Sequence, residues 1–227
     1  MPLTIALDGP VGAGKSTVCD AVAKRLGILH LDTGAMYRAA ALKVVREGIS
    51  PEDAEAVCRL AEKGQIRVSV RYTDDRQMTL LDGEDVSALI RTQEIGQAAS
   101  AISRYPCIRK RMVALQQEIA RSESMLLDGR DIGTVVLKDA DVKIYLTSSV
   151  EVRAQRRLKQ LREKGDQTPY EKVLGEVKAR DEQDMTRETD PLRQAEDAVL
   201  VDSSSLTFDE TVEVILDTIR KRHAGKE

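Results

Sequence analysis

The chain has 227 residues, which is enough for one α/β domain of ordinary size with a small appended lobe. Hydrophobic residues make up 41% and charged residues 32%, as in a globular protein in water, and the 3% of aromatic residues predicts an aliphatic core. The formal net charge of −3 argues against a general nucleic-acid-binding protein, because non-specific binding to a polyanion depends on a basic surface.

The cysteines, Cys19, Cys58 and Cys107, are widely spaced and odd in number. This pattern predicts neither a disulfide framework nor a C-x-x-C metal or redox site, and it fits a reducing cytoplasm, where we expect the protein to act. The first apolar run begins close to the N-terminus, so no signal peptide is expected. No apolar run approaches the roughly 18 residues that cross a membrane, so no membrane partner is expected either. The only histidines, His30 and His223, are interpreted as incidental.

A phosphate-binding loop is predicted directly after the first strand, an apolar run over residues 3–7. The stretch Gly9-Pro10-Val11-Gly12-Ala13-Gly14-Lys15-Ser16-Thr17 fits the pattern G-x-x-x-x-G-K-[ST]. Its glycines let successive backbone N–H groups point at one anion, and the helix that begins near Lys15 adds its positive dipole end. Lys15 would contact the β- and γ-phosphates of a nucleotide, and the Ser16 hydroxyl would coordinate Mg²⁺. The other interpretation, a glycine-rich turn with a surface lysine, is disfavoured because pattern and context agree.

The next elements alternate between helix and strand. A helix over about residues 15–26 ends at Gly27, and a strand over residues 28–31 leads through a turn at residues 32–38 into a helix that reaches about residue 47. This alternation is typical of an α/β protein with a parallel sheet. Ser50 as N-cap and Pro51 at the first helical position predict another helix, which Gly64 ends.

From residue 64 the apolar pattern changes to a period of two, over residues 66–72 and 77–81, with a turn at Asp74-Asp75. We therefore predict a small antiparallel β lobe inserted over about residues 64–92. Helices are predicted over residues 92–103, 106–121, about 149–164 and 170–185, and core strands over residues 125–128, 142–146 and 198–201. A capping box at residues 207–210 begins the terminal helix, whose core face carries Val212, Ile215, Leu216 and Ile219.

A phosphate-binding loop alone does not distinguish a switch protein, a motor and a kinase. The chain contains no Asn, so the guanine-binding pattern N-K-x-D of GTPase switches is excluded. Phosphoryl transfer between two phosphates needs cations that neutralise their mutual repulsion, and arginines lie near several predicted loop ends. These arginines are Arg38, Arg109, Arg130, Arg153, Arg156, Arg157, Arg180 and Arg187.

An arginine taken singly is most often a solvated surface residue, and this remains the interpretation of Arg162, as of Lys159. The stretch Asp128-Gly129-Arg130-Asp131 is more informative. It follows a predicted buried strand, on the side where an open α/β sheet binds ligands.

Five stretches together resemble the bacterial cytidylate kinases: residues 9–17, 32–38, 91–100, 128–134 and 180–187. The resemblance covers essentially the whole chain and implies a P-loop NTPase-type three-layer α/β fold. That fold has a central parallel five-stranded sheet, a helical lid and a small inserted antiparallel β lobe. It implies a single monomeric domain with a core of about residues 1–34, 93–150 and 186–227, a monophosphate-binding region of about 35–92, which contains the β lobe, and a lid of about 151–170.

The resemblance also implies the roles of individual residues. ATP is expected to bind Gly9, Pro10, Val11, Gly12, Ala13, Gly14, Lys15, Ser16 and Thr17, with Mg²⁺ at Ser16. The 5′-phosphate of CMP is expected to bind Arg38, Arg130 and Arg187, with Thr33 and Tyr37 close by. The cytosine edge is assigned to Ser100, Arg109 and Asp131. The ribose is assigned to Arg180 and Asp184. The catalytic set is Lys15, Arg130, Arg187 and two lid arginines, Arg153 and Arg157. Arg156 is a further candidate in the lid. The family usually has Ser where this chain has Thr33, and the hydroxyl is retained.

The expected reaction is in-line transfer of the γ-phosphoryl group of ATP to the phosphate of CMP or dCMP, which gives ADP and CDP or dCDP. Asp131 can accept a hydrogen bond from the 4-amino group of cytosine, which uracil lacks. Two alternatives remain open: a kinase for another small acceptor, such as a different nucleoside monophosphate or a shikimate-like acid, and a nucleotide-dependent switch without an acceptor. ADP production with and without CMP distinguishes them.

Overall fold

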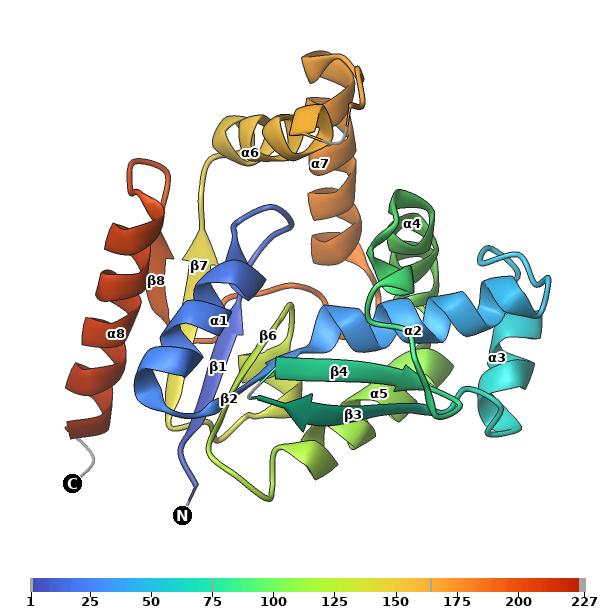
Figure 1. Ribbon diagram of the computed structural model, residues 1–227, viewed down its shortest axis with the longest axis horizontal. Coiled ribbons are helices and arrows are strands. Elements are labelled where there is room, and N and C mark those ends of the chain that lie inside the picture. The colour runs from blue at the N-terminus through green and yellow to red at the C-terminus, as the bar shows by residue number, and fades with distance from the viewer. Residues whose placement is uncertain (1, 75, 164, 225–227) are drawn as a thin grey trace.

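The central sheet consists of five parallel strands in the order β2-β6-β1-β7-β8. The computed structural model describes residues 2–74, 76–163 and 165–224. Within these ranges the strands are β1 (Thr4–Asp8), β2 (Leu29–Asp32), β6 (Met125–Gly129), β7 (Val142–Thr147) and β8 (Val199–Asp202). The predicted parallel sheet is therefore confirmed, and Figure 1 shows its strands running in one direction.

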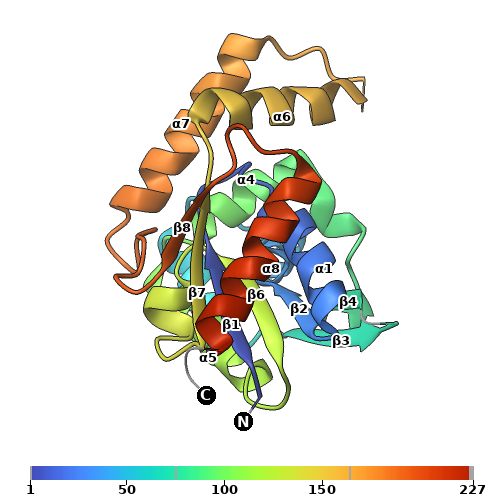
Figure 2. The ribbon, with the colours of Figure 1, turned by 90° about the vertical axis from the view of Figure 1, so that its left-hand side faces the viewer.

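Helices cover both faces of this sheet, because successive residues of a strand point to opposite sides. Ile5 and Leu7 of β1 pack with α1 (Lys15–Leu26) and α8 (Phe208–Ala224). Ala6 faces the other cluster, which includes residues of α2 (Thr33–Arg46), α4 (Gln93–Ile102) and α5 (Pro106–Ile119). Figure 2 shows α1 and α8 side by side in front of the sheet. The fold is thus the three-layer arrangement expected from the sequence.

The end of α1 and the start of α8 are capped as the sequence predicts. Gly27 ends α1 in the left-handed conformation, at φ 65°, and its N–H bonds to carbonyl oxygens of the last turn. Before α8, the Thr207 N–H donates to Glu210 and the Glu210 N–H donates to the Thr207 hydroxyl, which is the predicted capping box.

Two helix starts differ from the prediction. Helix α2 begins directly after β2, without a turn, because the Asp32 carboxylate accepts a hydrogen bond from the Ala35 N–H and caps the helix. Helix α3 (Ala54–Glu62) begins later than expected: its N-cap is Asp53, whose carboxylate accepts from the Ala56 N–H at 3.0 Å. The assignment of Ser50 as N-cap was therefore wrong, since a carboxylate three residues further along caps the helix instead.

The inserted β lobe is confirmed as an antiparallel sheet of β3 (Val68–Thr73), β4 (Arg76–Leu81) and the short β5 (Glu84–Asp85). Val68 pairs with Leu81, and both are buried against the cluster that contains α2. Asp75 of the predicted turn lies outside the described residues. A short 3₁₀ turn, η1 (Leu89–Arg91), connects the lobe to α4.

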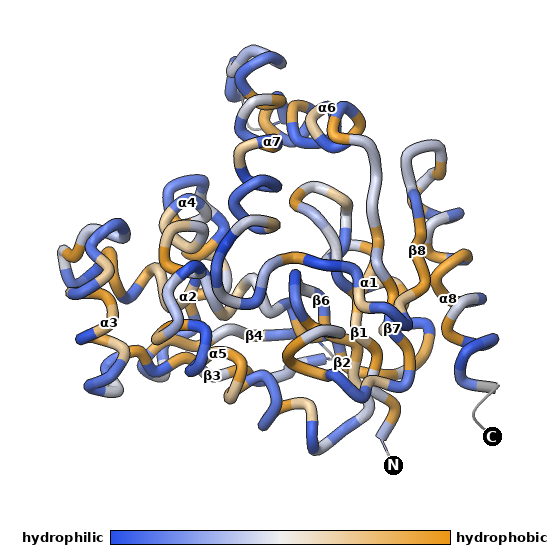
Figure 3. Tube along the Cα trace, turned by 180° about the vertical axis from the view of Figure 1, so that it is seen from behind, coloured by the Kyte–Doolittle hydropathy of each residue, from blue (hydrophilic) through white to orange (hydrophobic). Residues whose placement is uncertain are grey.

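Helices α6 (Val150–Glu163) and α7 (Tyr170–Thr186) form a separate helical pair. They pack on one another through a small apolar cluster that includes Ala154, Leu161 and Val173. Figure 1 shows the pair beyond the end of the sheet at which β1 and β7 finish, and Figure 3 shows mostly hydrophilic residues along α7. This pair therefore has a small core of its own, separate from the two clusters that flank the sheet.

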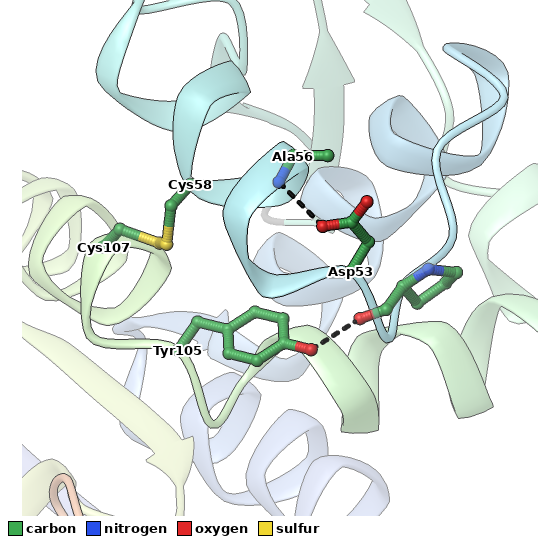
Figure 4. The surroundings of a disulfide bond; sticks show 6 residues. Asp53, Ala56, Cys58, Tyr105 and Cys107 are labelled. Atoms are coloured by element: carbon green, nitrogen blue, oxygen red, sulfur yellow. Dashed lines mark hydrogen bonds between the residues drawn. A yellow bond between two sulfur atoms is a disulfide. The ribbon is translucent and has the colours of Figure 1, made fainter.

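A disulfide joins Cys58 of α3 to Cys107 at the start of α5, across 49 residues of sequence. Figure 4 shows it near the hydrogen bond from the Tyr105 hydroxyl to the Pro51 carbonyl oxygen, which joins the segments that precede α5 and α3. The expectation of no disulfide was wrong, because the packing of α3 on α5 brings together two cysteines whose sequence spacing carries no pairing signal. Cys19 is free and buried.

None of the described helices combines the length and the hydropathy that a bilayer span requires.

Candidate functional site

A cavity of about 890 Å³ lies at the carboxyl end of the sheet, between the loops after β1 and β6 and the α6–α7 pair. It brings together residues from most of the chain. The predicted site residues in its wall are Val11, Gly12, Ala13, Gly14, Lys15, Ser16, Thr17, Thr33, Tyr37, Arg38, Arg109, Arg130, Asp131, Arg180, Asp184 and Arg187.

The loop between β1 and α1 forms one end of the cavity. Gly9 lies so close to β7 that a Cβ atom there would be 2.0 Å from the Leu146 carbonyl oxygen, so no other residue fits. Gly14 precedes α1 with φ 86°, a left-handed conformation, and gives the helix N-terminus an open approach from the cavity. The stretch from Gly9 to Thr17 therefore forms the predicted loop between β1 and α1, together with the start of α1.

Lys15 lies folded against this loop. Its ammonium group donates to the carbonyl oxygens of Gly9 and Pro10, both at 2.9 Å, and the side chain is buried. Burial and the neighbouring charge of Arg130 lower the pKa of Lys15 to about 7. An anion in the loop would favour the charged ammonium, so the site gains from binding a phosphate.

Ser16 is linked to a carboxylate on the neighbouring strand. Its hydroxyl donates to Asp128 Oδ2 at 2.9 Å, and Asp128 Oδ1 lies 2.9 Å from His30 Nε2. His30 Nδ1 in turn lies 2.6 Å from Asp20 Oδ1. Burial disfavours the charged imidazole, but the two carboxylates outweigh it and raise the pKa of His30 to about 10. His30, interpreted from the sequence as incidental, therefore orients Asp128.

The Ser16 hydroxyl and the Asp128 carboxylate are oxygen ligands of the kind that a hard divalent cation prefers. Among the described residues, no group of three or more His, Cys, Asp or Glu side chains could hold a metal ion. A divalent cation here would therefore have to take its remaining ligands from water and from the phosphates of a nucleotide. This is the usual way in which Mg²⁺ binds beside a phosphate-binding loop.

Asp8, at the end of β1, fixes the loop after β6. Its carboxylate oxygens accept from the backbone N–H groups of Ile132 and Gly133, each at 2.8 Å, at the start of a π-helical turn, η2 (Ile132–Val136). Burial raises the pKa of Asp8 to about 7, against the two hydrogen bonds that lower it. This contact holds the loop that carries Arg130 and Asp131 in the cavity wall. An acidic residue at a strand end is the one sign of it in the sequence.

The opposite end of the cavity is built from arginines that are held by carboxylates. Arg109, 1% exposed, donates to Asp131 and, through Nε at 2.8 Å, to Asp190. Arg187 Nη2 lies 3.4 Å from the other oxygen of Asp131 and also donates to the Asp190 carbonyl oxygen. The cytosine-edge residues Arg109 and Asp131 thus contact one another directly.

Asp184, 1% exposed, is shared by three arginines. Arg130 Nε lies 2.8 Å from Oδ2, while Arg180 Nε and Arg187 Nη1 lie 3.4 and 3.9 Å from Oδ1. Burial opposes ionisation, but the charges of Arg130 and Arg180 keep the pKa of Asp184 below its ordinary value. We call Asp131, Asp184 and the arginines Arg109, Arg130, Arg180 and Arg187 the arginine–aspartate cluster.

The wall of the cavity is positively charged although the chain as a whole is acidic. Among the described residues it carries nine basic side chains and five acidic ones. The basic ones are Lys15, Arg38, Arg91, Arg109, Arg130, Arg156, Lys159, Arg180 and Arg187, and the acidic ones are Asp32, Asp128, Asp131, Glu163 and Asp184. Such a wall concentrates anionic ligands locally without making the protein a general polyanion binder.

Three buried polar atoms in this wall have no hydrogen-bond partner: Tyr37 Oη, Arg180 Nε and Asp184 Oδ1. The Arg180 and Asp184 atoms face one another as an ion pair, without hydrogen-bond geometry. Buried polar groups are nearly always paired, so these atoms mark a place for a ligand with both donors and acceptors.

Five predicted residues are not in the cavity wall: Gly9, Pro10, Ser100, Arg153 and Arg157. Gly9 and Pro10 contribute carbonyl oxygens that accept from the Lys15 ammonium group. Arg153 is bound to the Val11 carbonyl oxygen at 3.0 Å and to Asp181 at 2.6 Å. The two lid arginines are thus outside the cavity. Burial lowers the pKa of Arg38, and the neighbouring charges of Arg91 and Arg157 add to this effect.

Ser100 lies behind the wall, where its hydroxyl donates to Gln183 Oε1 at 3.2 Å. The residue one turn further along α4, Ser103, is in the wall instead, as is Arg91, which pairs with Asp32 at 3.0 Å. Neither residue was singled out from the sequence. A helical spacing of three from Ser100 is the one signal that could have drawn attention to Ser103.

Comparison with known proteins gives a consistent result. The family model described as cytidylate kinase matches residues 5–221. A cytidylate kinase of Caldicellulosiruptor bescii is 46% identical over 96% of each chain, and that of Caldanaerobacter subterraneus subsp. tengcongensis is 47% identical over 100% of this chain and 98% of its own. A cytidylate kinase of Mycobacterium avium is 48% identical over 97% of this chain and 96% of its own. A solved gluconokinase from Sinorhizobium meliloti is similar in fold, with a TM-score of 0.52 and 17% identity over 99% of this chain and 95% of its own.

Proposed function

The chain belongs to the cytidylate kinase family, and on this premise we propose that it transfers the γ-phosphoryl group of ATP to the 5′-phosphate of CMP or dCMP, giving ADP and CDP or dCDP. The observation that carries the proposal is one cavity with two anion-binding ends. The loop from Gly9 to Thr17 lies at one end and the arginine–aspartate cluster at the other. A nucleoside triphosphate and a nucleoside monophosphate need such an arrangement to meet.

ATP binds through the loop in this proposal. The backbone N–H groups from Gly12 to Thr17 surround the β-phosphate, and the N-terminus of α1 adds its dipole. Lys15 leaves the carbonyl oxygens of Gly9 and Pro10 and follows the γ-phosphoryl group as negative charge redistributes in the transition state. Burial of Lys15 makes this interaction stronger than it would be in water.

Mg²⁺ would be held by the Ser16 hydroxyl and, directly or through water, by Asp128. When bound, it neutralises charge on the β- and γ-phosphates. His30 keeps the Asp128 carboxylate ionised and in position, because it contacts Oδ1 while Oδ2 accepts from the Ser16 hydroxyl.

CMP binds at the arginine–aspartate cluster. Its 5′-phosphate is placed by Arg38, Arg130 and Arg187, near the hydroxyls of Thr33 and Tyr37. Its ribose is placed by Arg180 and Asp184, whose ion-paired Nε and Oδ1 atoms have no hydrogen-bond partner and supply a donor and an acceptor. Arg109 and Asp131, with Ser100 behind them, select the base. The acceptor phosphate is ionised at neutral pH, so no general base is required.

We propose further that residues 151–170 act as a lid. Helix α6 packs on α7 through a small core that is separate from the main core. A movement of α6 toward the cavity would therefore leave the main core closed. Arg153 would exchange Asp181 and the Val11 carbonyl oxygen for the transferring phosphoryl group, and Arg157 would join it. Closure would exclude the water that otherwise hydrolyses ATP. In this proposal the enzyme works as a monomer on small nucleotides in the cytoplasm.

The test is ADP formation at fixed MgATP with CMP, dCMP, UMP or AMP as acceptor. We expect the highest kcat/KM with CMP or dCMP, lower values with UMP, and none above background with AMP. ADP formation that does not depend on any acceptor would support a nucleotide-dependent switch instead. A higher kcat/KM with AMP or with a carboxylic acid acceptor would show a kinase of different specificity.

A further inference from the structure

Ser103 follows the last turn of α4 and lies in the cavity wall beside Arg109. It is 7% exposed, and its carbonyl oxygen accepts from Arg109 Nη1 at 3.3 Å. The same guanidinium group donates to Asp131 and lies over the ring of Tyr37, 5.6 Å from the ring centroid. One guanidinium therefore joins Ser103 and Asp131, which places both at the end of the cavity that contains the Tyr37 ring.

The hydrogen of the Ser103 hydroxyl has a fixed partner. Ser103 Oγ lies 2.9 Å from the Ser100 carbonyl oxygen, and both atoms are buried. A carbonyl oxygen can only accept, so the hydroxyl must donate its single hydrogen to it. Toward any other group, Ser103 Oγ presents only lone pairs.

Gln183 also contacts Ser100, the residue whose carbonyl oxygen accepts from Ser103. Gln183 Nε2 donates to the same Ser100 carbonyl oxygen at 2.8 Å, and Gln183 Oε1 accepts from the Ser100 hydroxyl at 3.2 Å. Because the carbonyl oxygen requires a donor, the orientation of the Gln183 amide group is determined. The hydrogens of both serine hydroxyls are thus used inside the protein.

Ser103 Oγ and the Asp131 carboxylate are therefore two acceptors at one end of the cavity. A pyrimidine base carries its distinguishing group at position 4, where cytosine has an amino donor and uracil an oxygen acceptor. Acceptors fit the amino group, whereas uracil would bring one lone pair against another and leave buried groups unpaired.

We propose that Ser103 is a further base-selecting residue, whose hydroxyl oxygen accepts a hydrogen bond from the 4-amino group of cytosine beside Asp131. The inference rests on the proposed function, since it takes a cytidine nucleotide as the acceptor substrate. Ser100 and Gln183 are positioning residues that fix the hydrogen of the Ser103 hydroxyl by holding the carbonyl group to which it donates.

Ser103→Ala tests the proposal. It removes the acceptor without adding volume, and alanine is well tolerated at a helix end. We expect the ratio of kcat/KM for CMP to kcat/KM for UMP to fall about 5- to 30-fold, mainly through KM for CMP, with KM for ATP unchanged. Ser103→Thr keeps the hydroxyl and should hold the ratio within about 3-fold of the original value.

Ser122→Ala is a matched control. The Ser122 hydroxyl makes the same kind of bond, to the Ile119 carbonyl oxygen three residues back at 3.1 Å, but it is exposed at the end of α5 and outside the cavity. A second substrate separates recognition from structure: pyrimidin-2-one riboside 5′-monophosphate has no substituent at position 4. The original enzyme and Ser103→Ala should phosphorylate it with equal kcat/KM.

An unchanged ratio of CMP to UMP in Ser103→Ala overturns the inference. So does a loss with the pyrimidin-2-one nucleotide as large as that with CMP, because a structural effect would not depend on the amino group. If the original protein itself does not phosphorylate CMP, the proposed function fails, and this result is distinct from a folded, active enzyme whose selectivity ignores Ser103.

Discussion

The two ends of the cavity are built in different ways. The donor end is one continuous stretch, Gly9 to Thr17, which offers backbone N–H groups and one lysine to any chain of phosphates. The acceptor end is made of side chains from α2, α5, the loop after β6 and α7, and its arginines are held by carboxylates. Phosphate binding can therefore be local and general, whereas recognition of a particular nucleotide requires side chains that the whole fold brings together.

The electrostatics of the ends differ as well. Lys15 has carbonyl oxygens as partners and a pKa lowered to about 7, so binding of an anion favours its charged form. The guanidinium groups of the acceptor end keep permanent charges and share Asp131 and Asp184. Variants at the donor end should therefore affect all acceptors alike, while variants at the acceptor end should change which acceptor is used and how well it binds.

Lys15→Met is expected to have the largest effect. It removes the mobile cation, and kcat should fall about 10³-fold or more with CMP and with UMP, because developing charge on the phosphates loses its stabilisation. Steady-state ADP assays and circular dichroism check activity and folding. Lys24→Met, at an exposed position on the same helix, is the control. A loss confined to one acceptor would contradict the division between the two ends.

Asp184→Asn should disturb the acceptor end alone. The change keeps the shape of the side chain but leaves three guanidinium groups without their shared charge. We expect KM for CMP to rise about 10- to 100-fold with KM for ATP unchanged, and the free energy of unfolding to fall by about 3 kcal/mol. Kinetics and urea unfolding measure these effects. Asp209→Asn, exposed in the first turn of α8, should change neither, and an equal rise in both KM values would refute the prediction.

The disulfide between Cys58 and Cys107 lies outside both ends and should affect stability alone. Its removal in the double variant Cys58→Ser, Cys107→Ser should lower the free energy of unfolding by about 2–4 kcal/mol, because the link restrains the unfolded chain. A reducing agent should lower the value of the original protein equally and leave the variant unchanged. The values of kcat/KM should stay within about 2-fold, and a loss of activity on reduction would show that α3 and α5 couple to the site.

His30→Gln should give the smallest effect, and one that depends on pH. The folded-state pKa of His30 is about 10, above the ordinary value of 6.5, so its pairing with Asp128 and Asp20 stabilises the fold fully below pH 6.5. That contribution is lost as the pH rises from 6.5 to 10. The original protein should exceed the variant by about 1–3 kcal/mol in free energy of unfolding at pH 6, and by less at pH 9.5. A constant difference would mean that His30 is not charged.

The sequence predicts local features well, for a physical reason. Features that depend only on neighbours within a few residues can be predicted from one short stretch of sequence. Examples are the loop from Gly9 to Thr17, the left-handed Gly27 and the capping box at Thr207. The aliphatic runs likewise indicate strands that are buried on both faces. This accounts for the confirmed sheet, layers and β lobe.

Features that depend on distant parts of the chain could not be derived in this way. The arginine–aspartate cluster could be suspected from an excess of arginine, but its pairing of Arg109 with Asp131 and of Arg130 with Asp184 is set by how α5 and α7 meet the loop after β6. Individual roles there came from family resemblance and remain predictions. The disulfide was missed for the same reason.

The proposed reaction requires that the two ends of one cavity exchange a phosphoryl group directly. Incubation with ATP labelled at the γ-phosphate, with and without CMP, tests it by following the label. We predict that label appears in the β-phosphate of CDP in a 1:1 ratio to ADP, and that little ADP forms when CMP is omitted. Label that accumulates as inorganic phosphate at a rate independent of CMP would contradict the account.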